Sequence, residues 1–326
     1  MRDFVQALPK TETHLHIEAG LPYQLLRAWQ PDIYPAAPFF HEPDYRFPNF
    51  QKFDEILLGH ALPWFISAER YYESARVTFA RQVVENVRYV ETSFHLPITQ
   101  FIGVPGREII AAIRAAVPPG LEVRIFAGML RTDYAGAMQA VIDDLENWDD
   151  LAGVDLHGFE RPEFQPWSAD IWAKVSALGK VTKAHAGEFE SAADVRRAVE
   201  FLGVRRVQHG LSALGDPAVM QLLRDYDVTL DMTPISNVKL LAVPSMKAHP
   251  IKKFMEAGVR CTISTDDPML FGNRLCDEYV ALGTEGGLDR ATLVKIARNG
   301  FEVADLPAGV KAGYVRQLEA IGAENP

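Results

Sequence analysis

Short apolar runs alternate with longer amphipathic stretches along most of the chain. Eight β-rich runs predict strands, at residues 11–18, 87–95, 122–130, 151–158, 181–188, 204–210, 228–234 and 259–267. Between most of them the apolar positions recur with helical spacing, as in residues 107–116, 135–147, 192–202 and 216–225. Asp216-Pro217 is typical of a helix start, with Asp as the cap and Pro in the first helical position. Alternating strands and helices predict βαβ units around a parallel sheet.

Eight such units predict an α/β fold of the closed (β/α)8 TIM-barrel type, and we expect one barrel domain over residues 1–326. The rival is an open doubly wound sheet, which usually carries a glycine-rich phosphate loop after its first strand. Neither GxGxxG nor GxxxxGK[ST] occurs in the chain. A proline- and aromatic-rich segment at residues 31–53 separates the first two strands, and its prolines exclude one continuous helix. We expect it either to cover the barrel rim or to fill a gap in the wall, and we expect a final helix after about Leu306.

The amino-acid composition and net charge indicate which kind of binding partner to expect. The chain is 48% hydrophobic, and its 43 acidic and 33 basic residues give a net charge of -10. A nucleic-acid partner requires a basic face, so we expect a small-molecule substrate and no nucleic acid. No run of about 18 uncharged apolar residues predicts a membrane span. Charged residues near the start, where a signal peptide is apolar, and only two cysteines favour the cytoplasm. The pattern does not indicate an oligomeric state.

Several predicted strands end in acidic or histidine side chains. In barrel enzymes the carboxyl ends of the strands form the rim that holds the active site. Any one such residue can cap a strand or begin a loop, but five strand ends of this kind favour one shared site. The residues are His14, His16 and Glu18, then His157 and Glu160, His185 and Glu188, His209, and Asp266 with Asp267.

These side chains have the chemistry of a catalytic metal centre. His14 and His16 are two residues apart on a strand, so their imidazoles point to the same side. A third nitrogen from His185 and an oxygen from Asp266 would complete a zinc site. A catalytic zinc lowers the pKa of bound water from 15.7 to about 7. Iron and cobalt also suit these ligands.

Two more groups suit hydrolysis at such a centre. His209 can accept the proton of the water or orient it, and Glu188 can protonate a ring nitrogen of the substrate. The alternatives are a buried structural histidine and a carboxylate at a helix start. Lys183, two residues before His185, is expected inside the barrel, where it needs a carboxylate partner unless the register lets its amine reach water.

The chain resembles the adenosine deaminase family of metal-dependent amidohydrolase barrels, from Leu8-Pro9-Lys10 to about Tyr279. The matching motifs are His14-Leu15-His16, Asp155-Leu156-x-Gly158-x-Glu160, His185-Ala186-Gly187-Glu188, His209-Gly210, Ser236-Asn237 and Ser264-Thr265-Asp266-Asp267-Pro268. The resemblance implies one zinc ion per chain, held by His14, His16, His185 and Asp266. It also implies that Glu188 protonates purine N1, that His209 deprotonates or orients the water, that Asp267 bonds to N7, and that the Gly158 N–H bonds to N3.

Departures from the family pattern concern the substrate. Adenosine-specific members commonly have Asp and Gly after the His pair, where this chain has Glu18 and Ala19. The longer carboxylate resembles the adenine deaminases, whereas Gly158-x-Glu160 resembles the nucleoside type. We therefore expect hydrolytic deamination of an adenine-type purine at C6, with adenosine as the first choice. The alternatives are free adenine or another substituted adenine, then a non-catalytic purine-binding barrel or a zinc-dependent ester or amide hydrolase.

Overall fold

Eight parallel strands follow one another round a barrel in the order in which they occur along the chain. The computed structural model describes residues 1–324. The strands are β1 (Lys10–His16), β2 (Val87–His95), β3 (Glu122–Leu130), β4 (Gly153–His157), β5 (Val181–Ala186), β6 (Arg206–His209), β7 (Thr229–Met232) and β8 (Arg260–Ile263). The residues after β8 close the barrel onto β1, because the Asp266 N–H donates to the His14 carbonyl at 3.0 Å. The predicted barrel is confirmed, and every observed strand overlaps its predicted run.

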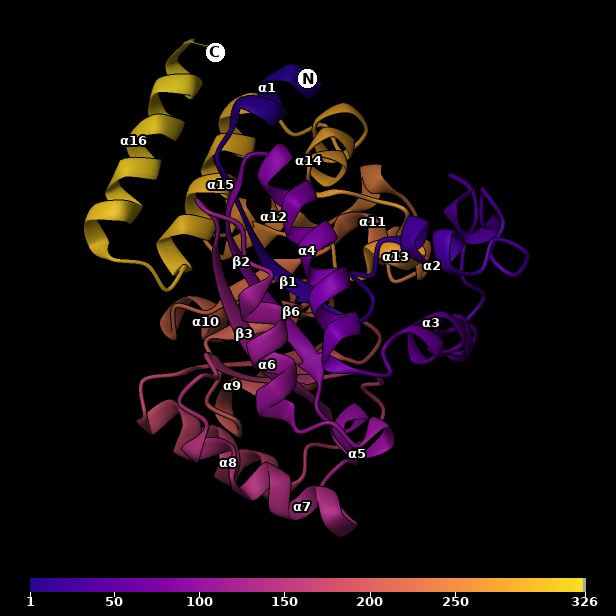
Figure 1. The fold of residues 1–326 in the computed structure, drawn as a ribbon. Helices are drawn as coiled ribbons and strands as arrows, with labels where there is room; N and C mark the ends of the chain where they lie inside the picture. The colour runs from indigo at the N-terminus through magenta and orange to yellow at the C-terminus, as the bar shows by residue number, and fades with distance from the viewer. Residues whose placement is uncertain (325–326) are drawn as a thin grey trace.

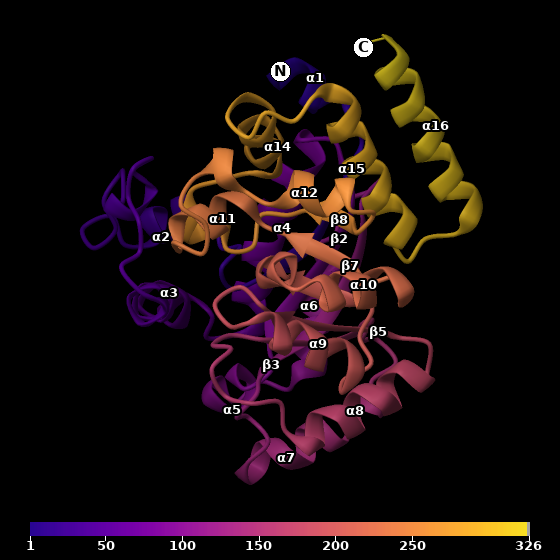
Figure 2. The same cartoon turned by 180° about the vertical axis from the view of Figure 1, so that it is seen from behind.

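Helices cover the outside of the barrel (Figures 1 and 2). Asp216 caps α10 as predicted, with its carboxylate accepting from the N–H groups of Ala218 at 2.8 Å and Val219 at 3.2 Å. The helices are α1 (Arg2–Ala7), α2 (Tyr23–Trp29), α3 (Phe50–Trp64), α4 (Ala68–Val84), α5 (Ile98–Ile102), α6 (Gly106–Ala115), α7 (Gly136–Asp143), α8 (Pro166–Ala177), α9 (Ala192–Glu200), α10 (Pro217–Asp225), α11 (Pro234–Lys239), α12 (Ile251–Glu256), α13 (Pro268–Phe271), α14 (Leu275–Thr284), α15 (Arg290–Val303) and α16 (Ala308–Glu324), with 3-10 turns η1 (Phe39–His41), η2 (Leu145–Asn147), η3 (Leu211–Gly215) and η4 (Met246–Ala248).

The part of the chain from α2 to α3, between β1 and β2, projects from one side of the barrel, away from α16 (Figure 1). It breaks into α2, η1 and α3, in agreement with the exclusion of one continuous helix. Phe50 and Phe53 of α3 line the cavity at the barrel rim, whereas Phe40 and Phe47 are buried in the hydrophobic core. The segment therefore both covers the rim and packs against the wall. Between residues 1 and 324, no helix is long and apolar enough to span a membrane.

A buried layer of charged residues lies inside the barrel, beneath the strand ends. The ammonium group of Lys183 contacts the carboxylate of Glu91 and donates to the Thr13 carbonyl at 2.6 Å. Arg206 joins the same carboxylate at 3.0 Å and that of Asp231 at 2.9 Å. The expected carboxylate partner of Lys183 is thus Glu91. Pairing is required because unpaired charges cost several kcal/mol to bury.

Candidate active site

Three imidazole nitrogens and one carboxylate oxygen meet at the carboxyl ends of β1, β5 and β8. The Nε2 atom of His185 lies 3.0 Å from that of His14 and 3.3 Å from that of His16. Oδ1 of Asp266 lies 3.2 Å from Nε2 of His14 and 3.4 Å from Nε2 of His16. Ligands about 2.0–2.1 Å from a tetrahedral zinc lie about 3.3–3.4 Å from one another. The spacing therefore suits a metal ion of this size.

Hydrogen bonds on the far side of the rings orient their lone pairs. Nδ1 of His14 donates to the Asp231 carbonyl at 3.2 Å, and Nδ1 of His185 donates to the Leu156 carbonyl at 3.2 Å. Nδ1 of His16 shares a hydrogen bond of 2.9 Å with the Ser93 hydroxyl. The Nε2 atoms of His14 and His185 are then left with lone pairs that face each other, and that of His14 also faces the Asp266 carboxylate. Such an arrangement is repulsive unless a cation lies at its centre, so these residues fit a metal ion.

The protonation of the rings agrees with this fit. Burial lowers the pKa of His185 to about 4, which keeps it neutral as a metal ligand must be. Burial also opposes the protonation of His16, but its hydrogen bond to Asp266 and the charges of Asp267, Asp266 and Asp155 raise its pKa to about 9. The neighbouring carboxylates thus favour a proton on the His16 ring, and a bound metal ion would take the place of that proton.

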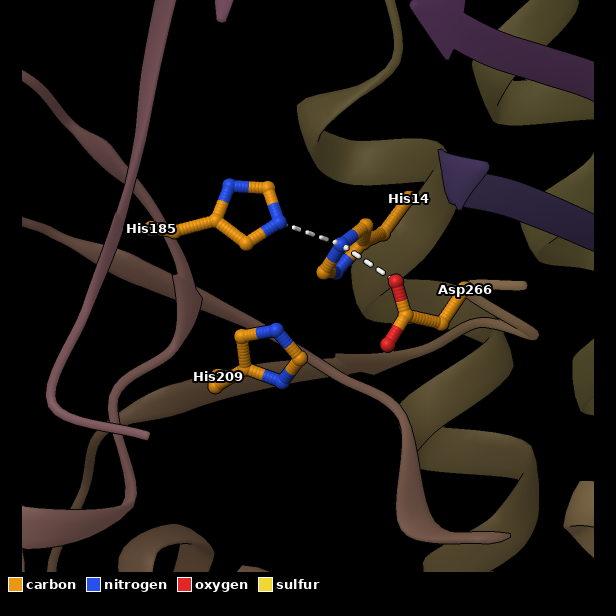
Figure 3. A group of neighbouring side chains, drawn as sticks. All are labelled: His14, His185, His209 and Asp266. Atoms are coloured by element: carbon orange, nitrogen blue, oxygen red, sulfur yellow. Dashed lines mark hydrogen bonds and ion pairs between the residues drawn. The ribbon is translucent and has the colours of Figure 1, made fainter. Parts of the chain in front are cut away.

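Figure 3 shows His209 beside His14, His185 and Asp266, and ligand atoms of these four residues lie within 4.8 Å of one another. His209 makes its polar contacts with other groups: Nε2 lies 3.5 Å from the Glu188 carboxylate, and Nδ1 lies 3.2 Å from the Thr233 hydroxyl. Burial lowers its pKa well below the usual range, so the ring is neutral. The shorter contacts of His16 make it the better fourth ligand, with His209 beside the centre.

Both Asp266 and His209 have strained backbones. Their φ angles are +66° and +63°, in the left-handed region that side chains other than glycine rarely adopt. The carboxylate of Asp266 is held by the Ser236 hydroxyl, which donates to Oδ2 at 2.7 Å. Strain of this kind costs of order 1–3 kcal/mol and persists where the surroundings hold the residue in place. It leaves Oδ1 of Asp266 directed at the three imidazoles.

Two carboxyl groups beside the cluster have pKa values that are shifted toward the protonated form. Burial raises the pKa of Glu188 well above its usual range, and the charges of Asp266 and Glu160 raise it further. Burial and then the charge of Asp266 raise the pKa of Asp267 in the same way. A protonated carboxyl group can donate to a ring nitrogen.

The turn that carries Glu188 is held by Glu160. The Glu160 carboxylate accepts from the backbone N–H groups of Glu188 at 3.1 Å and of Phe189 and Glu190 at 3.0 Å. The Glu160 side chain therefore holds this turn in place and is not directed at a ligand.

Asn237 links the two catalytic candidates from behind. Its Nδ2 donates to Oε1 of Glu188 at 3.0 Å and to Nδ1 of His209 at 3.1 Å. Its Oδ1 accepts from Nε2 of His249 at 3.2 Å, and Nδ1 of His249 accepts from the Ile251 N–H at 3.3 Å. Burial lowers the pKa of His249 to about 3, so this ring is neutral and fixes the direction of the Asn237 amide. With Nδ1 of His209 accepting, the ring proton lies on Nε2, facing Glu188.

A cavity of about 270 Å³ opens from this cluster toward α3. Gly158 lines it with φ +78°, and a Cβ there would lie 2.3 Å from Cδ2 of Leu130. Glu18 also lines it, with Oε1 accepting from the Tyr71 hydroxyl at 2.6 Å and the His95 N–H at 3.1 Å. The nine residues given a metal, catalytic or substrate-binding role in the sequence analysis thus lie in or next to one site: His14, His16, Glu18, Gly158, His185, Glu188, His209, Asp266 and Asp267.

Sequence reasoning assigned no role to several other residues of the site. His95 and His157 line the cavity, with Nδ1 of His95 3.0 Å from Nε2 of His157. Both end a strand: His157 was already among the strand-end residues, and the same pattern applies to His95, which was missed. Asn237 and His249 come from α11 and the turn before α12, and only the fold places them behind Glu188.

Comparison with known proteins supports one family. The family model for adenosine deaminase matches residues 9–321. An adenine deaminase from Sphingopyxis alaskensis is 31% identical, covering 97% of this chain and 96% of its own length. One from Cupriavidus necator is also 31% identical, covering 99% and 94%. Among solved structures, an adenine deaminase from Arthrobacter aurescens superposes with a TM-score of 0.85 at 23% identity, covering 96% and 98%. A zinc-bound amidohydrolase from Burkholderia ambifaria superposes with a TM-score of 0.84 at 20% identity, covering 99% and 94%. The chain belongs to the adenosine deaminase family.

Proposed function

We propose that this protein hydrolyses the 6-amino group of adenine, giving hypoxanthine and ammonia. The observation that carries the proposal is the cluster of three imidazoles and a carboxylate, which faces the same cavity as protonated Glu188. Relatives that are 30–31% identical over nearly their full lengths are adenine deaminases. Free adenine, the alternative in the sequence analysis, is therefore better supported than adenosine, while the reaction type is the same.

One zinc ion is the proposed cofactor, with His14, His16, His185 and Asp266 as its ligands. The spacing of the four ligand atoms supports this choice, as does the zinc bound to a solved amidohydrolase of the same fold. When bound, zinc lowers the pKa of a coordinated water and so supplies a nucleophile near neutral pH.

The surrounding side chains then have distinct tasks. Glu188 donates its proton to N1 of the purine, which withdraws electrons from C6 and prepares it for the addition of water. His209 orients the water through its Nε2 proton, because Asn237 occupies Nδ1. Protonated Asp267 donates to N7, and the Gly158 N–H donates to N3. The oxygen of the water forms a bond to C6, the amino nitrogen gains a proton, and the C6–N bond breaks to release ammonia.

The charges of the cavity bear on the choice of substrate. Within residues 1–324, its lining has no lysine or arginine, and its carboxyl groups include Asp54 and Glu18. A nucleotide phosphate would have no positive partner there, which favours a substrate without a phosphate group. The outer wall is apolar, formed by Phe50, Leu57 and Leu62 together with other side chains of α3, and it offers few partners for ribose hydroxyls.

An ammonia-release assay on the zinc-loaded enzyme tests the proposal with adenine, adenosine and adenosine 5′-monophosphate. We expect adenine to have the highest kcat/KM and the nucleotide to give no ammonia. Glu188→Gln is the control that assigns the ammonia to this site. A higher kcat/KM for adenosine would restore the adenosine assignment. If no 6-aminopurine released ammonia from protein with a full complement of metal, the proposed reaction would be wrong.

A further inference from the structure

A second cavity, of about 300 Å³, lies beside the first and has a different chemistry. It is bounded by α2, the later turns of α4, and the chain from Thr265 to Leu275. Glu18 and Ala19 line the catalytic cavity, and the next residue, Gly20, lines the second one. Asp266 lines the catalytic cavity, and its neighbour Thr265 lines the second one. The two cavities therefore share a wall one residue thick, but they have separate linings.

Three arginines line this second cavity: Arg27, Arg81 and Arg274. In the described part of the chain, the side chains of Arg27 and Arg81 make no hydrogen bond or ion pair, and Arg274 reaches only Glu85, at 3.9 Å. Burial, and then the charge of Arg274, lower the pKa of Arg81, whereas the charge of Glu85 raises it. Three positive charges thus face the single carboxylate of Glu85 in a protein whose net charge is -10.

The polar groups of the same cavity also lack partners. The Tyr23 hydroxyl, Oε1 of Gln82 and Oδ1 of Asn273 are buried and accept or donate no hydrogen bond within residues 1–324. The amide nitrogens are engaged elsewhere: Nδ2 of Asn273 donates to the Thr265 carbonyl at 3.1 Å, and Nε2 of Gln82 donates to Glu12 at 3.4 Å. The two amide oxygens are therefore enclosed acceptors without a donor.

We propose that this cavity binds a phosphate monoester, such as a small sugar phosphate. Arg81 is half-buried and has no ion-pair partner in the described chain, so a bound anion would offset a charge that solvent only partly screens. A phosphate monoester carries about -1.5 to -2 charges at pH 7 and accepts paired hydrogen bonds from guanidinium groups. Arg27 and Arg274 are exposed, so the ligand can enter from solvent.

Isothermal titration calorimetry on the zinc-loaded enzyme tests this site, with ribose 5-phosphate, inorganic phosphate and ribose as probes. We expect saturable binding of ribose 5-phosphate, weaker binding of inorganic phosphate and none of ribose. Arg27→Gln and Arg274→Gln change exposed side chains, so both variants should fold. Because a hydrogen bond to a charged group contributes about 1.5–3 kcal/mol, each should weaken binding about 10- to 150-fold.

Arg76→Gln is the matched control, since Arg76 is an exposed arginine of α4 that does not line the cavity. It should bind ribose 5-phosphate as the wild type does. No saturable heat at about 10 mM ribose 5-phosphate would overturn the proposal, since that limit corresponds to less than about 3 kcal/mol of affinity. Equal binding by the wild type and the Arg27 and Arg274 variants would also overturn it. The readout is heat of binding, so it does not depend on whether the enzyme deaminates adenine.

Discussion

Replacing Asn237 with leucine tests whether the network behind the catalytic groups positions them. Leucine has the same branching and the same number of side-chain heavy atoms as asparagine but neither donates nor accepts. The change removes the hydrogen bond to Oε1 of Glu188 at 3.0 Å and the one to Nδ1 of His209 at 3.1 Å. It also leaves Nε2 of His249 without its acceptor. The metal cluster is untouched, because Asn237 makes no contact with the proposed ligands.

The magnitude follows from the two bonds that reach the catalytic groups. Each hydrogen bond contributes about 0.5–1.5 kcal/mol net, so together they account for about 1–3 kcal/mol. If that energy holds Glu188 and His209 in place only for the transition state, kcat should fall about 5- to 150-fold while KM changes little. The buried N–H left unpaired on His249 should also lower the free energy of unfolding by about 1–3 kcal/mol.

Steady-state kinetics with adenine, normalised to metal content and folded fraction, measures the effect. Asn299→Leu is the matched control, because Asn299 is also a buried asparagine whose Nδ2 donates to a carbonyl, that of Cys261, at 2.9 Å. It should lose stability and keep kcat. In the Glu188→Gln background, Asn237→Leu should cost less than it does alone. A kcat within twofold of the wild type, or an equal loss in Asn299→Leu, would refute the positioning role.

Three further changes test other parts of the site. Glu188→Gln should retain zinc and lose about 10²–10⁴ in turnover, because proton donation to N1 is removed; full activity in kinetic assays would exclude Glu188 from the reaction. His16→Ala should lose metal in elemental analysis, whereas His60→Ala, which is outside the cluster, should keep it. An unchanged zinc content in His16→Ala would contradict the ligand assignment. Burial raises the pKa of Glu12 from 4.5 to about 7, so the stability present below pH 4.5 should be lost as the pH rises through 7, by about 3 kcal/mol. Glu12→Gln should abolish this loss in urea unfolding at pH 5 and pH 8, and a wild-type-like pH dependence in that variant would contradict the assignment.

Local patterns along the chain were sufficient to predict the barrel and much of its site. Each strand overlaps a short β-rich run, and amphipathic stretches lie between most of these runs, so alternation alone predicts a parallel sheet covered by helices. Parallel strands in a closed barrel place all their carboxyl ends on one rim. The polar residues that end the runs, such as His14, His185 and Asp266, could therefore be grouped before any coordinates were known.

Contacts between distant segments needed the tertiary structure, because they depend on side-chain direction and on burial. The hydrogen bonds of Asn237 join α11 to the ends of β5 and β6, and no local pattern encodes such a contact. The raised pKa values of Glu188 and Asp267 arise from burial among neighbouring charges, which residue type alone does not determine. The arginine-lined cavity likewise brings together Arg27, Arg81 and Arg274, which are scattered along the chain and become one positive site only when the fold places them side by side.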